Sequence, residues 1–133
     1  NKTEVLGQTQ VNGLDPVSAG TIFNIENNLP KGRLSAALVQ DIGSLTAMIR
    51  ANYYSQTIDE RGQQEVVSPE TLFDIEFSYP VSTSFRLLVG ANNVVDNYPD
   101  EIATRLSQGM PYPRRTPIGY HGGMMYVRGA YTF

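Results

Sequence analysis

Nine basic and aromatic side chains are the residues of this sequence best suited to bind a ligand. An arginine guanidinium recognises anions through paired hydrogen bonds, and an aromatic ring offers a flat face for stacking. Three of the nine lie in segments with strand-like alternation, and six lie in the long segment that follows residue 93. The candidates are Arg50, Arg86, Arg128, Tyr98, Tyr112, Arg114, Arg115, Tyr120 and His121.

Both groups of candidates have a second interpretation. The three strand arginines share a face with Asp74 and Glu76, so these charges could instead form a ladder of salt bridges. The loop candidates have a similar alternative, because basic and aromatic residues also occur in surface loops for other reasons. Ligand contact is therefore a hypothesis for all nine side chains.

The sequence predicts neither an enzyme nor a metal protein. It contains one histidine, His121, and no cysteine, which excludes a thiolate metal site and a cysteine nucleophile. Asp96, Asp100 and Glu101 are close in sequence, but their spacing is not that of a calcium-binding EF-hand loop. We therefore expect no catalytic residue, no cofactor and no resident metal.

The overall composition narrows the class of protein. The 133 residues have the length of one domain and a formal net charge of −3, which disfavours nucleic acid as a partner. Charged residues make up 17% of the chain, whereas a typical soluble domain has roughly 25%. No apolar run reaches the ~18 residues of a membrane-spanning helix.

The C-terminal stretch MMYVRGAYTF (124–133) predicts a β-strand. Its residues alternate strictly, and alternate side chains of a strand point to opposite faces. Met125, Val127, Gly129, Tyr131 and Phe133 share one face, which is uncharged. The other face carries the one charge of the stretch, and such a strand needs neighbours to pair with.

Four further segments have strand character. The predicted strands cover residues 33–40, 45–55, 70–79, 84–93 and 122–133, with short turns at 41–44 and 80–83. Long polar loops alternate with these short turns. We therefore predict an all-β, antiparallel up-and-down meander for residues 33–133. Residues 1–32 are predicted to form an external loop with a partial strand at TIFNI (21–25).

In the four most regular strands, residues can be sorted by parity, that is, by whether they occupy odd or even positions. This sorting gives one face without any charge. The members of this face are Leu45, Ala47, Ile49, Ala51, Tyr53, Phe73, Ile75, Phe77, Tyr79, Phe85, Leu87, Val89, Ala91, Met125, Val127, Gly129, Tyr131 and Phe133. The opposite face carries charges of both signs. A soluble β-sandwich also gives such alternation, so a soluble binding module is one interpretation.

Two features favour a membrane barrel. Aromatic residues lie at both ends of the uncharged face, as in the girdles at the two surfaces of a membrane. The alternation of short turns with long loops is typical of outer-membrane barrels, whose tilted strands need ~9–11 residues to cross. The strands are fewer than the roughly eight of the smallest such barrels, so we expect residues or chains outside this sequence to complete the barrel.

Several stretches, taken in order, resemble the C-terminal barrel segment of TonB-dependent outer-membrane receptors. LLVGANNVVDNYP (87–99) resembles a family stretch of the form l-x-v-g-x-NlfD-x-yP, and YPRRTPIGYHGGMMYVRGAYTF (112–133) is similar to the family's terminus. LPKGR, IRANYYS and LFDIEFSY precede them in matching order. The resemblance covers about residues 29–133, although Val94-Val95 replace Leu-Phe and Gly129 replaces a bulky apolar residue.

The resemblance implies a fold and an activity. The fold would be the last strands of a transmembrane β-barrel of about 22 strands, plugged by an N-terminal domain. The activity would be active import of a scarce ligand, such as a siderophore, cobalamin, an oligosaccharide or a peptide, across the Gram-negative outer membrane.

The resemblance also implies partners. These would be outer-membrane lipid, the upstream strands and plug domain of the same receptor, TonB through an N-terminal part outside this sequence, and the barrel-assembly machinery. Phe133 and Tyr131 would form the assembly signal. A smaller outer-membrane barrel with a structural or adhesive role is the alternative.

Overall fold

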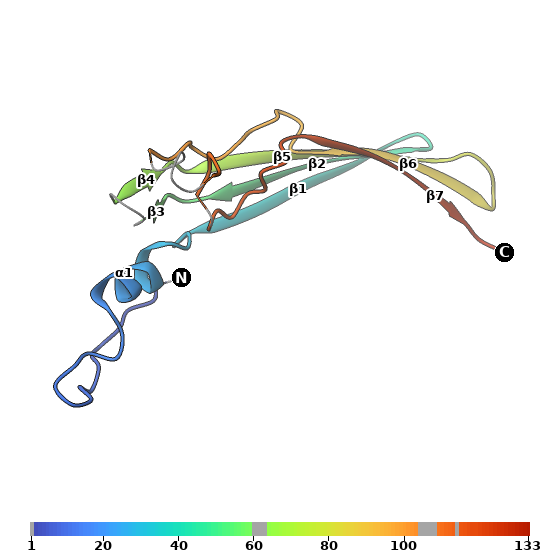
Figure 1. The fold of residues 1–133 in the computed structure, drawn as a ribbon. Coiled ribbons are helices and arrows are strands. Elements are labelled where there is room, and N and C mark those ends of the chain that lie inside the picture. Colours follow the sequence, from blue (N-terminus) through green and yellow to red (C-terminus); the bar gives the residue numbers. More distant parts are fainter. Residues whose placement is uncertain (1, 60–63, 104–108, 114) are drawn as a thin grey trace. The chain divides into compact units, whose positions relative to one another are not determined.

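The computed structural model describes residues 2–59, 64–103, 109–113 and 115–133 (Figure 1). Its contacts divide the chain into two compact units. The sheet unit comprises residues 34–53, 71–98 and 121–133, and the loop unit comprises residues 1–33, 54–70 and 99–120.

A five-stranded sheet with the order β1-β2-β5-β6-β7 forms the sheet unit (Figure 1). Its strands are β1 (Arg33–Ile42), β2 (Leu45–Tyr54), β5 (Glu70–Pro80), β6 (Phe85–Asn92) and β7 (Met124–Tyr131). β6 pairs antiparallel with both β5 and β7. The predicted all-β antiparallel architecture is confirmed, with both short turns near their predicted positions.

The register of β5, β6 and β7 confirms that their side chains sort onto two faces by parity. Phe77 stands opposite Val89, and Val89 stands opposite Val127. This apolar face is open in the described chain, since Val127 is 71% exposed and Phe77 is 44% exposed. Its other exposed large side chains are Ile49, Tyr53, Phe73, Tyr79, Val89, Met125, Tyr131 and Phe133.

The opposite, polar face is held together by hydrogen bonds between side chains. Ser35 Oγ on β1 donates to Asn52 Oδ1 on β2 at 2.8 Å, and Asn52 Nδ2 donates to Asp74 Oδ2 on β5 at 3.0 Å. The other carboxylate oxygen of Asp74 accepts from the backbone N–H of Asn93 at 3.0 Å. This chain of bonds connects three neighbouring strands and the end of β6.

A second link on the polar face crosses β6 at a glycine. Glu76, Gly90 and Tyr126 lie in one row of the register, and Tyr126 Oη donates to Glu76 Oε2 at 2.8 Å. A Cβ atom built on Gly90 would collide with the ring of Tyr126. The side chain of Tyr126 can cross β6 to reach β5 because position 90 has no side chain.

The described residues of the loop unit form the helix α1 (Ala19–Asn27) and a small antiparallel pair, β3 (Thr57–Asp59) with β4 (Glu65–Val67). α1 contacts β3. The buried apolar side chains of this unit are Val67, Ile102, Pro113 and Ile118. No helix in the described part of the chain is long and apolar enough to span a membrane.

The partial strand predicted at TIFNI is wrong, because these residues belong to α1. Ser18 caps the helix, its Oγ accepting from the backbone N–H of Thr21 at 3.2 Å, and such a cap supplies a partner that the first turn lacks. The predicted polar loop at 56–69 also contains β3 and β4. Thr57 and Val67 are opposite each other and buried, yet three-residue strands are too short to give a periodic signal.

We predict that Gly90→Ala destabilises the sheet by about 1–3 kcal/mol, the usual cost of overpacking. Alanine at this position would displace the ring of Tyr126 and break its hydrogen bond to Glu76. Urea unfolding of the single variants and of Gly90→Ala/Tyr126→Ser measures the coupling. In the background that lacks the ring, Gly90→Ala should cost little; additive losses would contradict the account.

Candidate functional site

The segment that follows β6 is a tight turn fixed by its own side chains. Asn93 and Asp96 have φ angles of 49° and 58°, in the left-handed region that asparagine and aspartate tolerate better than most residues. Asn93 Nδ2 donates to the carbonyl of Asn97 at 2.7 Å, and the Asn97 N–H donates back to Asn93 Oδ1 at 3.0 Å. Asn93 is also buried. These contacts give the NNVVDNYP stretch a structural role.

The same turn holds the start of β7. Asp96 Oδ1 accepts from the backbone N–H of Gly123 at 2.7 Å, one residue before β7 begins. Gly122 has a φ of 63°, and a Cβ atom there would collide with Asp96 and Tyr98. The two stretches that carry the strongest sequence resemblance therefore lie in contact, and their conformations depend on each other.

We predict that Asp96→Ala destabilises the sheet unit by about 1–3 kcal/mol, whereas Asp96→Asn is nearly neutral. Alanine leaves the Gly123 N–H without its acceptor and places an alanine at positive φ. Asparagine keeps an acceptor oxygen and tolerates that φ. Thermal unfolding of both variants measures the difference, and equal losses would show that the Asp96–Gly123 bond contributes nothing.

The three strand arginines lie on the polar face and are exposed. Arg86 Nη1 donates to Ser78 Oγ at a long 3.4 Å, and Arg50 Nη2 lies 3.5 Å from Met48 Sδ. The guanidinium of Arg128 lies 6.0 Å from the ring centroid of Tyr126. The structure thus places all three on the face where the sequence analysis expected them.

The salt-bridge ladder considered for this face is wrong for the described residues. In the described part of the chain, no ion pair joins Arg50, Arg86 or Arg128 to Asp74 or Glu76. Asp74 and Glu76 instead accept hydrogen bonds from neutral donors, as described above. Parity predicts which face a charge occupies but does not identify its partner.

The loop candidates are divided between the two units. Tyr112, Arg115 and Tyr120 belong to the loop unit, whereas Tyr98 and His121 belong to the sheet unit. Arg114 lies outside the described residues.

Within the loop unit, two candidate rings stack on each other. Tyr112 and Tyr120 have centroids 6.0 Å apart and planes inclined by 6°. Tyr120 Oη donates to the carbonyl of Pro113 at 2.7 Å, which fixes this stack beside a buried proline.

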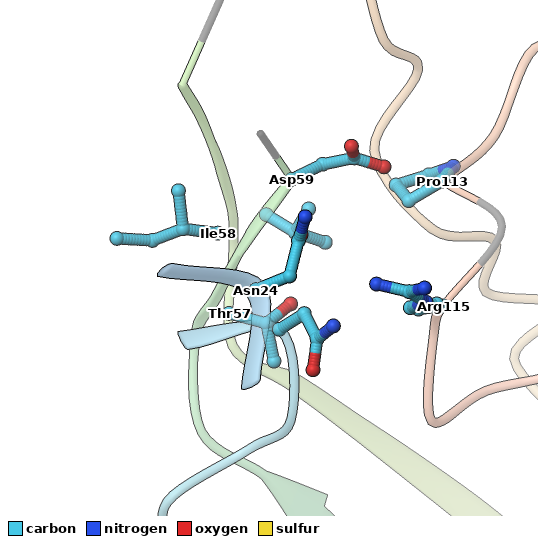
Figure 2. A pocket seen from close by; sticks show the side chains of 8 residues that line it. Asn24, Thr57, Ile58, Asp59, Pro113 and Arg115 are labelled. Atoms are coloured by element: carbon cyan, nitrogen blue, oxygen red, sulfur yellow. The ribbon is translucent and has the colours of Figure 1, made fainter. Parts of the chain in front are cut away.

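A cavity of about 110 Å³ in the loop unit brings polar side chains from three segments together. Figure 2 shows this hollow. Its lining includes Asn24 on α1, Thr57, Ile58 and Asp59 on β3, and, from the segment between β6 and β7, Pro113 and Arg115. Asn28 and Val67 complete the lining. Of the eight candidates that lie among the described residues, Arg115 is the one that lines the cavity.

The other polar residues of the cavity were missed at the level of sequence. Asn24 and Asn28 are four residues apart, a spacing that places side chains on one face of a helix. Because the sequence predicts a loop and a partial strand for this segment, the four-residue spacing of Asn24 and Asn28 does not indicate a shared helix face there. Thr57 and Asp59 lie in a strand that no pattern indicated.

The remaining predicted residues form the end of the chain. Tyr131 and Phe133 make an edge-to-face contact, with centroids 5.2 Å apart, and both side chains are exposed. Among the described residues, no group of three or more acidic, histidine or cysteine side chains could hold a metal ion.

Comparison with known proteins adds no identification. No protein family matches the chain, and no curated protein or solved structure matches it significantly.

Proposed function

We propose that this chain is the C-terminal barrel segment of a TonB-dependent importer in the outer membrane of a Gram-negative bacterium. In this proposal the sheet unit contributes the last five strands of a plugged barrel of about 22 strands. It acts by binding and transport and carries out no covalent chemistry.

The observation that carries the proposal is the exposed apolar face of the sheet. All five strands have 8 to 11 residues, close to the ~9–11 that cross the hydrocarbon core when tilted. The apolar face holds no charge in β2, β5, β6 or β7, and its large side chains stay exposed in the described chain. Such a patch rarely faces water, and lipid is a partner of matching length and chemistry.

The outer strands of the sheet support the same proposal. β1 and β7 are its two ends, and each therefore presents one edge without a strand partner in the described sheet. In hydrocarbon an unpaired backbone edge is prohibitively costly, so upstream strands of the same receptor would have to pair with both edges. Closure would place the arginine-bearing polar face toward the lumen and the plug domain.

The positions of two motif stretches also support the proposal. The stretches 93–98 and 122–123, which resemble the family pattern, contact each other through Asp96 and Gly123. Import would then proceed by capture of the ligand at the external loops and its passage through the lumen as the plug rearranges with energy from TonB.

We predict that Val89→Arg impairs barrel assembly, while Leu88→Arg is much milder. These residues are adjacent on β6 but face opposite sides, with Val89 on the apolar face between Phe77 and Val127. An arginine in lipid near the midplane costs ~2–4 kcal/mol, whereas a lumen-facing arginine stays hydrated. Heat-modifiable migration of the membrane-inserted protein measures assembly, and equal tolerance of the two variants would contradict the proposed facing.

Transport is tested separately by uptake. A strain that lacks the gene, compared with a complemented strain, should lose accumulation of a ferric siderophore, cobalamin, an oligosaccharide or a peptide. In the complemented strain, a protonophore should abolish the restored uptake, because TonB relays the energy of the proton gradient. Unchanged accumulation of all four would contradict the importer but leave an outer-membrane barrel with a structural role.

A further inference from the structure

We propose that Asn12 is a site of spontaneous chemical modification, at which the side-chain amide is converted into aspartate or isoaspartate. The reaction is an attack by the backbone nitrogen of Gly13 on Cγ of Asn12, and water is its co-reactant. The inference goes beyond the proposed import function and does not depend on it, because the site lies in the loop unit ahead of α1 (Figure 1).

The site lies in loop 8–17, which is closed at its base by side chains. Gln8 Nε2 donates to the carbonyl of Val17 at 3.0 Å, and the Val17 N–H donates back to Gln8 Oε1 at 3.0 Å. Gln10 Nε2 donates to Asp15 Oδ1 at 3.2 Å, further along the same loop. These bonds hold the two arms of the loop together, so its tip is a defined turn.

The tip of the loop is a two-residue turn of type I′. Val11 and Leu14 pair through both of their backbone groups, with N–H to carbonyl bonds of 2.9 and 3.0 Å. Asn12 and Gly13 lie between them, with φ angles of 53° and 75°. A type I′ turn requires positive φ at both central residues and favours Asn-Gly for that reason.

Nothing in the described chain shields the reacting atoms. Asn12 is exposed, and neither Asn12 nor Gly13 has a hydrogen bond with another described residue. No atom lies within 4 Å of a Cβ atom built on Gly13. Glycine also has no side chain of its own to block the approach of its nitrogen. This is the one Asn-Gly pair in the sequence.

The reaction balances without an oxidant or a reductant. The Gly13 nitrogen forms a bond to Cγ of Asn12 while the bond from Cγ to Nδ2 breaks, and the proton of the Gly13 nitrogen leaves with the amide group as ammonia. The product is a cyclic imide. Water then adds to either carbonyl of the ring: opening on one side gives aspartate, and opening on the other gives isoaspartate, in which Cβ and Cγ belong to the main chain.

The two products have different effects on the turn. Both add a negative charge at the tip. Aspartate keeps the length of the main chain, and it tolerates positive φ. Isoaspartate adds one methylene group to the main chain, so the geometry that pairs Val11 with Leu14 is lost. The modification therefore opens the tip of loop 8–17 when the product is isoaspartate.

Mass spectrometry of the purified protein, incubated in mildly alkaline buffer and then digested with trypsin, tests where conversion occurs. Cleavage after Lys2 and Lys31 gives peptide 3–31, which also contains Asn24, Asn27 and Asn28 as internal controls. These three lie on α1 or at its C-cap. Conversion at Asn12 should be at least about tenfold faster than at any of them, because the helix must open before its asparagines react.

Hydrogen exchange tests the effect on the turn. In the isoaspartate product, the backbone N–H groups of Val11 and Leu14 should exchange at least about tenfold faster than in the parent, since each loses its hydrogen bond. Asn12→Asp is the matched control: it introduces the charge without the extra methylene group, and its exchange at both positions should stay close to that of the parent.

Three results would overturn the inference. The first is equal conversion at the four asparagines of peptide 3–31 in the folded protein. The second is conversion of Asn12 in the isolated peptide with none in the folded protein over the same period, which would show that the turn protects the site. The third is unchanged exchange of Val11 and Leu14 in the isoaspartate product. None of these results bears on membrane insertion or uptake.

Discussion

The apolar face of the five-stranded sheet is the constraint on which the rest of the structure depends. Each exposed apolar side chain costs free energy in water in proportion to its area, and here these side chains are contiguous across neighbouring strands. The backbone adds a second requirement, because the outer edges of β1 and β7 need hydrogen-bond partners wherever water is excluded. In the proposed barrel, lipid against the face and further strands at both edges would satisfy the two requirements together.

The polar face shows how the sheet keeps its register without relying on ion pairs. Asp74 and Glu76 receive hydrogen bonds from an amide, a backbone N–H and a phenol, and each bond ties a strand to another strand or to a strand end. The three arginines of this face are left exposed. In a barrel they would be the side chains of this segment most able to meet anionic groups in the lumen or on the plug.

Alternation predicted the sheet well because a strand that is covered differently on its two faces must alternate. The facing of β5, β6 and β7 follows from that signal, and the two short turns follow from turn residues between apolar runs. The loop unit was not predictable in the same way. α1 is stabilised by the Ser18 cap and by contacts with β3. β3 is stabilised by pairing with β4. The cavity depends on these elements, so Arg115 could be proposed as a ligand residue while Asn24 and Thr57 could not.

Fluorescence quenching along β7 tests the central claim most directly. The chain has no cysteine, so single cysteines can be placed at each position from 124 to 131 and labelled with a small fluorophore. In vesicles of brominated lipid, labels at positions 125, 127, 129 and 131 should be strongly quenched, and those at the alternate positions should not. Weak quenching at every position, or quenching without a period of two, would contradict a lipid-facing apolar sheet.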